Sequence, residues 1–208
     1  MVSDRRQTIE EFLTAAAAKQ PAPGGGSVTA LVGALAASMG EMVLNYSVGK
    51  KDLADHQDEL KEALAELGRA REMLLELMVE DQAAFEALGA IRKLPKEDST
   101  RAGKFDAALL TCIRVPQAIG TLAAAVLRLC EKLVDRVNRY LLSDLAVCAE
   151  LAMAAVRCAA YNVRINLHDV ADLTERKKFD ALAAKQIQES SKIIQRLMPH
   201  IWAWQGRA

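Results

Sequence analysis

The chain has 208 residues, in which 27 lysine and arginine side chains balance 27 aspartate and glutamate side chains. With a formal net charge of zero, no overall field would recruit nucleic acid or an anionic membrane, so neither is expected as a partner. Hydrophobic residues make up 51% of the chain but aromatic residues only 4%, so helix-favouring alanine and aliphatic side chains supply the apolar mass. We therefore predict an all-α fold, a multi-helix bundle of long and short helices, with residues 1–208 as a single domain.

The four cysteines indicate an intracellular protein. Cys112, Cys130, Cys148 and Cys158 all lie in helical patterns, and no Cys-x-x-Cys pair occurs. They are expected to be reduced thiols of the core, which is typical of the cytoplasm. The first residues carry charges and no apolar h-region, so a secretory signal peptide is not predicted.

The N-terminal part predicts a short helix and then a glycine-rich loop. Thr8 and Glu11 form a Thr-x-x-Glu capping box, and this helix should end before Pro21. Four loop residues are candidate ligand contacts: Gly24, Gly25, Gly26 and Ser27. The glycines permit positive φ and leave the backbone open, and the serine is a good N-cap for a helix from about Val28. The first N–H groups of that helix can hold an anion or a polar ligand edge; the alternative interpretation is a plain turn.

The segment over 28–48 predicts a buried central helix. Gly33, Ala37 and Gly40 lie at spacings of four and three, so another helix can pack closely against that face. The segment is also long enough to span a bilayer. Because Glu41 lies near its middle and no second candidate span is recognised, a membrane helix is not predicted.

A long amphipathic helix is predicted next, over about 52–94. Gly49 should end the helix before it in a left-handed conformation, with Lys50 beside its negative end. Arg71 and Asp81 interrupt the apolar stripe of the long helix. A carboxylate in such a stripe must be paired, capped or functional, and the pattern does not choose between these alternatives.

Three further helical segments complete the predicted bundle. The pattern over about 100–134 contains Pro116, which should break or kink the helix. After a short connector a long helix is predicted over 143–167, and its first residue, a serine, is the candidate N-cap. Asp172 should cap the last helix, which is expected to end at Pro199.

The helix over 143–167 carries polar residues that suggest a dimer. Asn162 and Asn166 are four residues apart and share a face, either as polar contacts between helices or as ligand groups. Asp144 and Asn162 point the same way but lie about 27 Å apart along the helix, so one straight helix cannot place both on one small ligand. We therefore expect a homodimer whose two-fold axis passes near Met153, with Asp144 of one chain towards Asn162 of the other.

No metal-binding or covalent-nucleophile motif is recognised. His56, His168 and His200 are scattered, and none lies in a His-x-x-x-His or Cys/His arrangement. No Ser-His-Asp or Cys-His signature occurs either. A metal centre or a covalent intermediate is therefore not predicted.

Several short motifs follow one another along the chain. They are Pro-Ala-Pro-Gly-Gly-Gly-Ser at 21–27, Met42-Val43, Gly49-Lys50-Lys51, Asp81 with Phe85, Leu94-Pro95, Asn138 ahead of Ser143-Asp144, and Asn162-Val163-Arg164-Ile165-Asn166. In this order they resemble the cyclodeaminase/cyclohydrolase family, which contains the C-terminal half of formiminotransferase-cyclodeaminase and stand-alone methenyltetrahydrofolate cyclohydrolases. The resemblance covers about residues 8–170 and implies a helical, dimeric, stand-alone folate enzyme without metal or organic cofactor. The chain departs from the family pattern at Val137, where a glycine is expected.

The resemblance implies a folate one-carbon reaction. We expect hydrolysis of 5,10-methenyltetrahydrofolate to 10-formyltetrahydrofolate, in which water adds to the methenyl carbon. One alternative is a formiminotetrahydrofolate cyclodeaminase, in which N10 attacks the formimino carbon and ammonia leaves. A further alternative is a helical folate-binding or scaffold protein without turnover.

The same resemblance implies the roles of the site residues. The expected catalytic residues are Asp81 or Asp144 as the acid–base group and Lys50 as a charge that tunes it or steadies the substrate. The expected substrate-binding residues are Gly24, Gly25, Gly26, Ser27, Asn138, Ser143, Asn162 and Asn166. Both reactions need a proton shuttle and polar groups that orient the pterin, and neither needs a covalent nucleophile.

Overall fold

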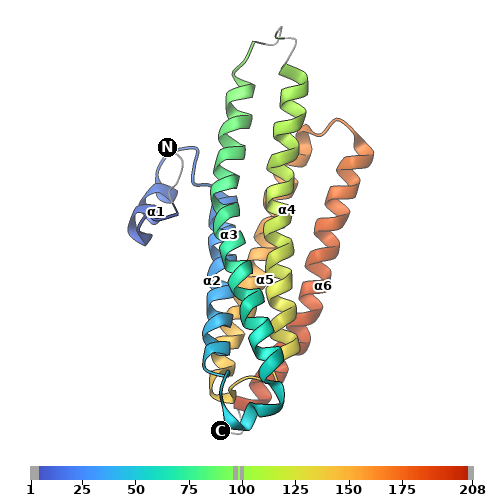
Figure 1. The fold of residues 1–208 in the computed structure, drawn as a ribbon. Helices are drawn as coiled ribbons and strands as arrows, with labels where there is room; N and C mark the ends of the chain where they lie inside the picture. The colour runs from blue at the N-terminus through green and yellow to red at the C-terminus, as the bar shows by residue number, and fades with distance from the viewer. Residues whose placement is uncertain (1–4, 96–97, 99–100, 206–208) are drawn as a thin grey trace.

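A computed structural model describes residues 5–95, 98 and 101–205, which form α-helices and short 3₁₀ turns without a β-strand (Figure 1). In chain order the elements are α1 (Ile9–Ala17), α2 (Gly25–Asn45), η1 (Lys51–His56), α3 (Gln57–Arg92), α4 (Arg101–Leu133), η2 (Arg139–Leu141), α5 (Leu142–Asn166), η3 (Leu167–Asp169) and α6 (Leu173–Gln205). The long helices α2 to α6 lie side by side as a bundle, and the short α1 lies at its flank (Figure 1). The predicted all-α fold class is confirmed.

Helices α2 and α5 form the centre of the bundle. Helix α2 packs against α3, α4 and α5, and α5 packs against α2, α4 and α6. A Cβ atom on Gly40 would lie 2.8 Å from Cδ1 of Leu67, so the predicted close packing on the small-residue face of α2 is present. The main core cluster contains Leu44, Leu127 and Met153, each almost fully buried. Small residues thus bring the helix backbones close, and aliphatic side chains fill the space between them.

Local start and stop signals are present where the sequence predicts them. In the capping box, the Thr8 N–H donates to Glu11 Oε2 at 2.7 Å, and Thr8 Oγ1 accepts from the Glu11 N–H at 3.2 Å. Gly49 has a φ of +83°, the left-handed conformation expected after α2. Asp172 Oδ1 accepts from the Thr174 N–H at 2.7 Å and so caps α6. These features depend on neighbours in the chain, which explains why the sequence shows them.

Of the break or kink predicted at Pro116, the break is wrong, because helix α4 continues through this residue. A proline has no N–H to donate to the carbonyl of the residue four positions earlier, here Cys112. Asn166 of α5 supplies the missing donor, because its Nδ2 atom lies 3.1 Å from the Cys112 oxygen. The side-chain hydrogen bond and the packing of α4 against α5 keep the proline inside the helix.

Helix α6 also continues past its predicted end. It contains Pro199 and reaches Gln205. Met198 and Ile201 are buried in the main core cluster on either side of this proline. Tertiary burial of the last turns therefore outweighs the helix-breaking tendency of one proline.

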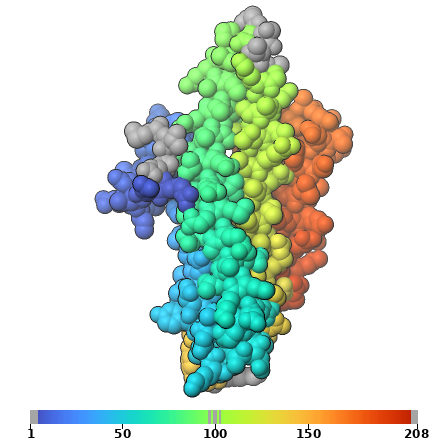
Figure 2. Space-filling model, viewed as in Figure 1, coloured from blue at the N-terminus to red at the C-terminus, as the bar shows by residue number. Residues whose placement is uncertain are grey.

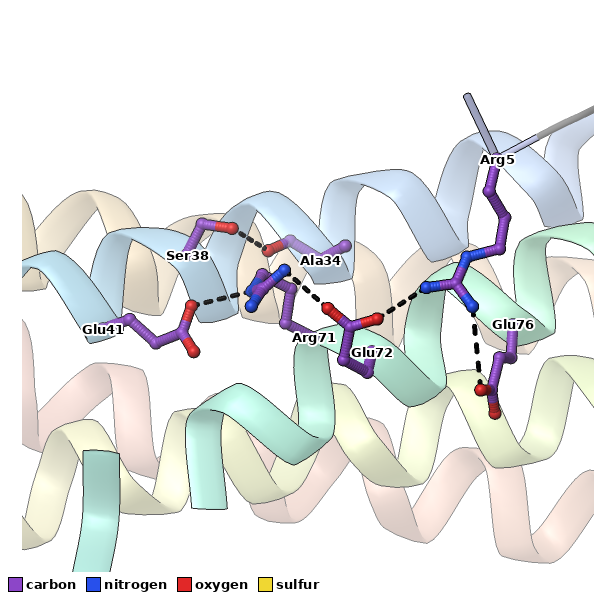
Figure 3. Close-up of polar contacts among 7 residues, drawn as sticks. All are labelled: Arg5, Ala34, Ser38, Glu41, Arg71, Glu72 and Glu76. Atoms are coloured by element: carbon purple, nitrogen blue, oxygen red, sulfur yellow. Dashed lines mark hydrogen bonds and ion pairs between the residues drawn. The ribbon is translucent and has the colours of Figure 1, made fainter. Parts of the chain in front are cut away.

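A chain of ion pairs connects the N-terminal segment with α3 and α2 (Figure 3). Arg5 pairs with Glu72 and Glu76, and Arg71 pairs with Glu72 and, at 2.8 Å, with Glu41 of α2. The pair with Glu41 explains why an arginine interrupts the apolar stripe of α3. Partly exposed pairs of this kind contribute little to stability, so their role is to orient the segments.

In the part of the chain that the structure describes, two helices are long and apolar enough to cross a membrane by length and composition, namely residues 25–45 and 103–133. The second of these was not recognised in the sequence. In each case 56% of the apolar window is buried inside the bundle. The apolar faces of both helices are therefore largely covered by other helices of the same chain.

Three of the four cysteines are buried, as predicted, and Cys158 is exposed, so the expectation of a core thiol is wrong for this residue. It lies on the outer face of α5. In the core, the Sγ atoms of Cys130 and Cys148 lie 3.3 Å apart. The hydrogen bond between these thiols, together with burial, raises the pKa of Cys130 well above its usual value, so Cys130 remains protonated.

Phe12 anchors α1, which stands out from the side of the bundle (Figure 2). Of the nine residues of this helix, Phe12 alone is buried, with 4% of its surface exposed. Its ring packs in a cluster that includes Ala34, Leu74 and Ile119. The position of α1 beside the start of α2 therefore depends on one aromatic ring.

We predict that Phe12→Ala detaches α1 from the bundle. Removal of a buried phenyl ring costs about 3–5 kcal/mol, which exceeds what the other contacts of a nine-residue helix can replace. Limited proteolysis within residues 18–24 should become much faster. Leu13→Ala is the matched control, because Leu13 is 60% exposed and its loss should leave cleavage unchanged. Equal cleavage rates in the two variants would contradict the anchoring role.

Candidate active site

The start of α2 differs from the prediction at two points. The helix begins at Gly25 with Gly24 as N-cap, rather than at Val28 with Ser27 as N-cap. None of the three loop glycines has a positive φ, since among the described residues that conformation occurs at Gly49 alone. Gly25 and Gly26 are needed for space instead, because side chains from α5 and α3 lie directly against this first turn.

Asp81 of α3 lies on the first turn of α2. The Ser27 hydroxyl donates to Asp81 Oδ2 at 3.0 Å, and a methyl group on Gly26 would overlap the carboxylate. Gly24 has no side chain to cap the helix. The carboxylate therefore supplies, from a neighbouring helix, the negative charge that favours a helix N-terminus. Of the alternatives left open by the sequence, the structure shows the hydrogen-bonded cap, and this arrangement is compatible with a functional role for the same carboxyl.

The environment of Asp81 changes its acidity. Burial raises the pKa of the Asp81 carboxyl above its ordinary value, and hydrogen bonds from the side chain and backbone of Ser27 lower it by less. The carboxyl group therefore keeps its proton to a higher pH than an exposed aspartate does. Such a group is suited to accept a proton and return it in the same reaction.

Asn162 of α5 lies on the other side of this turn. Its Nδ2 atom donates to Thr29 Oγ1 and to the Cys158 carbonyl, both at 3.1 Å. Thr29 Oγ1 donates in turn to the Gly25 carbonyl at 2.6 Å. A Cβ atom on Gly25 would lie 2.9 Å from Asn162 Oδ1, so this oxygen stands beside the exposed backbone of Gly25. Thr29 was not predicted; the available signal was a threonine four residues after Gly25 within an apolar run.

Two residues next to this turn face in opposite directions. Asn166 faces into the bundle, where its Nδ2 atom donates to the carbonyls of Cys112 and Asn162 at 3.1 and 2.9 Å. Phe85 follows Asp81 by one turn of α3 and is 47% exposed, so this aromatic side chain lies at the surface. Its ring is kept out of the core, and the site gains an exposed aromatic face.

The remaining predicted residues lie at the opposite end of α2 and α5. They are Lys50, Asn138, Ser143 and Asp144. The backbone N–H of Asn138 donates to Ser47 Oγ at 2.8 Å, just beyond the end of α2. Lys50 Nζ lies 6.0 Å from the centre of the Tyr140 ring, on the turn before α5. Asp144 is half-buried in the first turn of α5.

Ser143 does not cap α5, so this prediction is wrong. The helix begins one residue earlier, at Leu142, and its N-cap is Leu141 without a side-chain hydrogen bond. Asn138 organises the entry instead, because its Oδ1 atom accepts from the Tyr140 N–H at 3.2 Å. The turn η2 thus runs directly into α5 and leaves Ser143 exposed.

One chain therefore divides the predicted residues into two groups. Helices α2 and α5 are antiparallel, and the 21 residues of α2 span about 30 Å between the Asp81 group and the Asp144 group. Met153, expected near a two-fold axis, is 1% exposed and belongs to the core, so its side chain cannot lie in an interface. The exposed residue at the same level of α5 is Ala154.

A cavity of about 360 Å³ lies between α4, α5 and α6. Its lining includes Pro116, Arg128 and Ser190 and none of the predicted site residues. Within residues 5–95, 98 and 101–205, no group of three His, Cys, Asp or Glu side chains is arranged to hold a metal ion. The predicted catalytic carboxyl that contacts other predicted site residues is Asp81, which lies against Gly26 and Ser27 at the start of α2.

Comparison with known proteins identifies the family. Residues 8–185 match the family described as Formiminotransferase-cyclodeaminase, and the chain therefore belongs to it. The chain is 35% identical over 187 residues to a methenyltetrahydrofolate cyclohydrolase of Methylorubrum extorquens, covering 86% of this chain and 90% of that protein. It is 30% identical over 188 residues to the formimidoyltransferase-cyclodeaminase of Rattus norvegicus. The chain spans 35% of the length of that longer protein.

A solved structure shares the whole fold. The crystal structure of formiminotetrahydrofolate cyclodeaminase from Thermotoga maritima superimposes with a TM-score of 0.81. The two sequences are 28% identical, and the match covers 96% of each chain. The family expected from the ordered motifs is thus confirmed by sequence and by structure.

We predict that Asp81→Asn does not destabilise the protein at neutral pH. The raised pKa means that folding disfavours the ionised carboxyl and so costs stability. This loss of stability is absent below the ordinary aspartate pKa, grows as the pH rises, and is complete above the raised pKa. Asparagine still offers Ser27 an acceptor and carries no charge. Thermal unfolding should therefore give Asp81→Asn a Tm at neutral pH equal to or above that of the wild type.

The difference in Tm between Asp81→Asn and the wild type should shrink as the pH falls below the raised pKa of Asp81, because the aspartate then becomes neutral like the asparagine. Asp169→Asn is the control, since Asp169 is exposed and forms a surface ion pair with Arg92. A clear loss of Tm in Asp81→Asn at neutral pH would contradict the desolvation argument.

Proposed function

We propose that this chain hydrolyses 5,10-methenyltetrahydrofolate to 10-formyltetrahydrofolate. The observation that carries the proposal is the half-buried Asp81 carboxylate on the start of α2, within a chain 35% identical to a methenyltetrahydrofolate cyclohydrolase over most of its length. The motifs of the sequence predict the same activity. Folate one-carbon enzymes are also the relatives that the family comparison finds.

Asp81 is the proposed acid–base residue. The methenyl bridge carries a positive charge shared by N5 and N10, which a neighbouring carboxylate attracts. Water forms a bond to the bridging carbon, and Asp81 takes one water proton and passes it to N5 as the carbon–N5 bond breaks. The second water proton leaves to solvent as the hydroxyl becomes the formyl C=O, so the positive charge of the substrate is released as H⁺. The hydroxyl of Ser27 holds the carboxylate in one orientation through its hydrogen bond. This scheme needs neither a metal ion nor an organic cofactor.

Binding of the pterin is assigned to groups around the same turn. The Gly25 backbone and Asn162 Oδ1 present polar atoms at the protein surface. Phe85 presents an exposed ring on the face of α3 that carries Asp81, and a flat aromatic ring is suited to stack on a pterin. These residues together offer hydrogen bonds at the edge of the ligand and apolar contact over its face.

We further propose that a homodimer completes the site. A stripe on the outer face of α5 has coiled-coil spacing and consists of Val147, Leu151, Ala154, Cys158, Tyr161 and Ile165. Tyr161 and Ile165 are 67% and 68% exposed, which is unusual for large side chains of a central helix. An antiparallel copy packed on this stripe would cover it and bring Asp144 of one chain towards Asn162 of the other.

The charges on this face support a two-fold axis between residues 153 and 154. Glu150 and Arg157 lie at equal distances along α5 from that level and are both exposed. Neither forms an ion pair within the described part of the chain. In an antiparallel crossing, each Glu150 would meet the Arg157 of the other chain, so one interface would contain two complementary pairs.

In this dimer, each site combines two groups of residues. One chain contributes the start of α2 with Asp81 and Asn162. The other contributes the far end of its bundle, with Lys50, Asn138, Ser143 and Asp144. Lys50 can then steady the substrate, and Asp144 is available as a second proton-transfer group.

The second candidate function is cyclodeamination of formiminotetrahydrofolate, favoured by the likeness to the Thermotoga maritima cyclodeaminase. The same carboxylate would assist the attack of N10 and the departure of ammonia. Both reactions belong to the central metabolism of a cell, and we propose a cytoplasmic location with no membrane or nucleic acid as partner.

A pair of assays tests the reaction. Addition of the protein to methenyltetrahydrofolate should remove its absorbance, and addition to formiminotetrahydrofolate should release no ammonia. Asp81→Asn should lower turnover about 10²-fold or more through loss of the acid–base group, with Asp169→Asn unchanged as control. Ammonia release without hydrolysis would favour the cyclodeaminase, and absence of both activities would refute catalysis.

Mixing two inactive variants tests the shared site. Asp81→Asn and Asp144→Asn, unfolded and refolded together, should recover about a quarter of wild-type activity, because half of the dimers are mixed and each has one complete site of two. Neither variant should recover when refolded alone. If both variants lose turnover and the mixture stays inactive, the site lies within one chain.

A further inference from the structure

We propose that Asn166 is a positioning residue, which compensates for Pro116 inside α4 and thereby holds the start of α2 in the geometry of the site. The inference rests on the proposed function, because it concerns the residues assigned there to substrate binding. It assigns Asn166 a task other than direct contact with folate. Three observations lead to it, one for each helix involved.

The first observation is the carbonyl that Pro116 leaves without its helical donor. In an α-helix the N–H of residue 116 would donate to the oxygen of Cys112, and proline has no N–H. The Asn166 amide donates to that oxygen at 3.1 Å. Cys112 is buried, so without Asn166 its carbonyl would lose a partner in a place where water is scarce.

The second observation is that the same amide is bound within its own helix. Asn166 Nδ2 also donates to the backbone carbonyl of Asn162 at 2.9 Å. One amide group thus connects α4 with the last turns of α5. Because a primary amide has two N–H donors, both bonds can exist together, which neither aspartate nor alanine could provide.

The third observation continues the connection to α2. Asn162 Nδ2 donates to Thr29 Oγ1 at 3.1 Å, and Thr29 Oγ1 donates to the Gly25 carbonyl at 2.6 Å. The line of hydrogen bonds therefore runs from α4 through α5 to the residue that begins α2. A shift of α5 on α4 would move Asn162 Oδ1 away from the exposed Gly25 backbone.

A double-mutant cycle tests the inference. Asn166→Ala in the wild-type background should lower Tm by about 4 °C, the effect of one buried carbonyl without a donor. It should raise KM for methenyltetrahydrofolate about tenfold and change kcat much less, because binding groups move while Asp81 remains. In a Pro116→Ala background the new N–H satisfies Cys112, so at least half of both effects should disappear.

Pro199→Ala is the matched control, because it also removes a proline from a helix interior but lies in α6, away from Asn166. In that background Asn166→Ala should keep its full effect on Tm and KM. A second control, Asn45→Ala, removes an exposed amide from the end of α2 and should change neither quantity.

The outcomes separate the alternatives. If Asn166 contacts folate directly, its loss will raise KM equally with and without Pro116, and the inference is overturned. The inference is also overturned if Tm shows no coupling between Asn166 and Pro116, or if Asn166→Ala lowers Tm but leaves KM normal. A wild-type protein without turnover overturns the proposed function and the inference with it, whereas normal turnover with uncoupled variants overturns the inference alone.

Discussion

The burial of one carboxylate against the first turn of α2 is the constraint on which the candidate site depends. An ionised group in a half-buried position needs donors, and Asp81 has the Ser27 hydroxyl at 3.0 Å and the positive end of a helix. This approach is possible because Gly26 has no side chain in the way. The requirement for space at this point explains the glycine-rich start of α2 better than any need for an unusual backbone conformation.

The antiparallel packing of α2 on α5 determines how the polar residues are distributed. Small residues let these two helices approach closely, and their length separates the Asp81 group from the Asp144 group by about 30 Å. A single chain therefore presents the predicted polar residues as two separate groups, one at each end of these helices. The exposed stripe on α5 lies between the Asp81 group and the Asp144 group. A second copy packed on this stripe, as proposed above, would therefore lie between the two groups.

Polar side chains inside the bundle hold the helices in register near the site. Pro116 removes a hydrogen bond from α4, and Asn166 of α5 replaces it at 3.1 Å. Asn162 and Thr29 extend the connection to Gly25. Hydrogen bonds of this kind are directional, so they fix the relative position of three helices more sharply than contacts between alanines do.

The sequence by itself determined the all-α class, the capping box at Thr8, the left-handed Gly49 and the exceptional position of Asp81. Each of these follows from residues within about one helical turn of each other, or from a break in a regular apolar pattern. The ordered motifs also determined the family. What only the tertiary structure decided is which distant side chains meet. Ser27 binds Asp81 across 54 positions of the chain instead of capping its own helix, and Pro116 stays helical because Asn166, 50 positions later, lies beside it. Local propensity carries no record of such neighbours, because close approach depends on how whole helices pack.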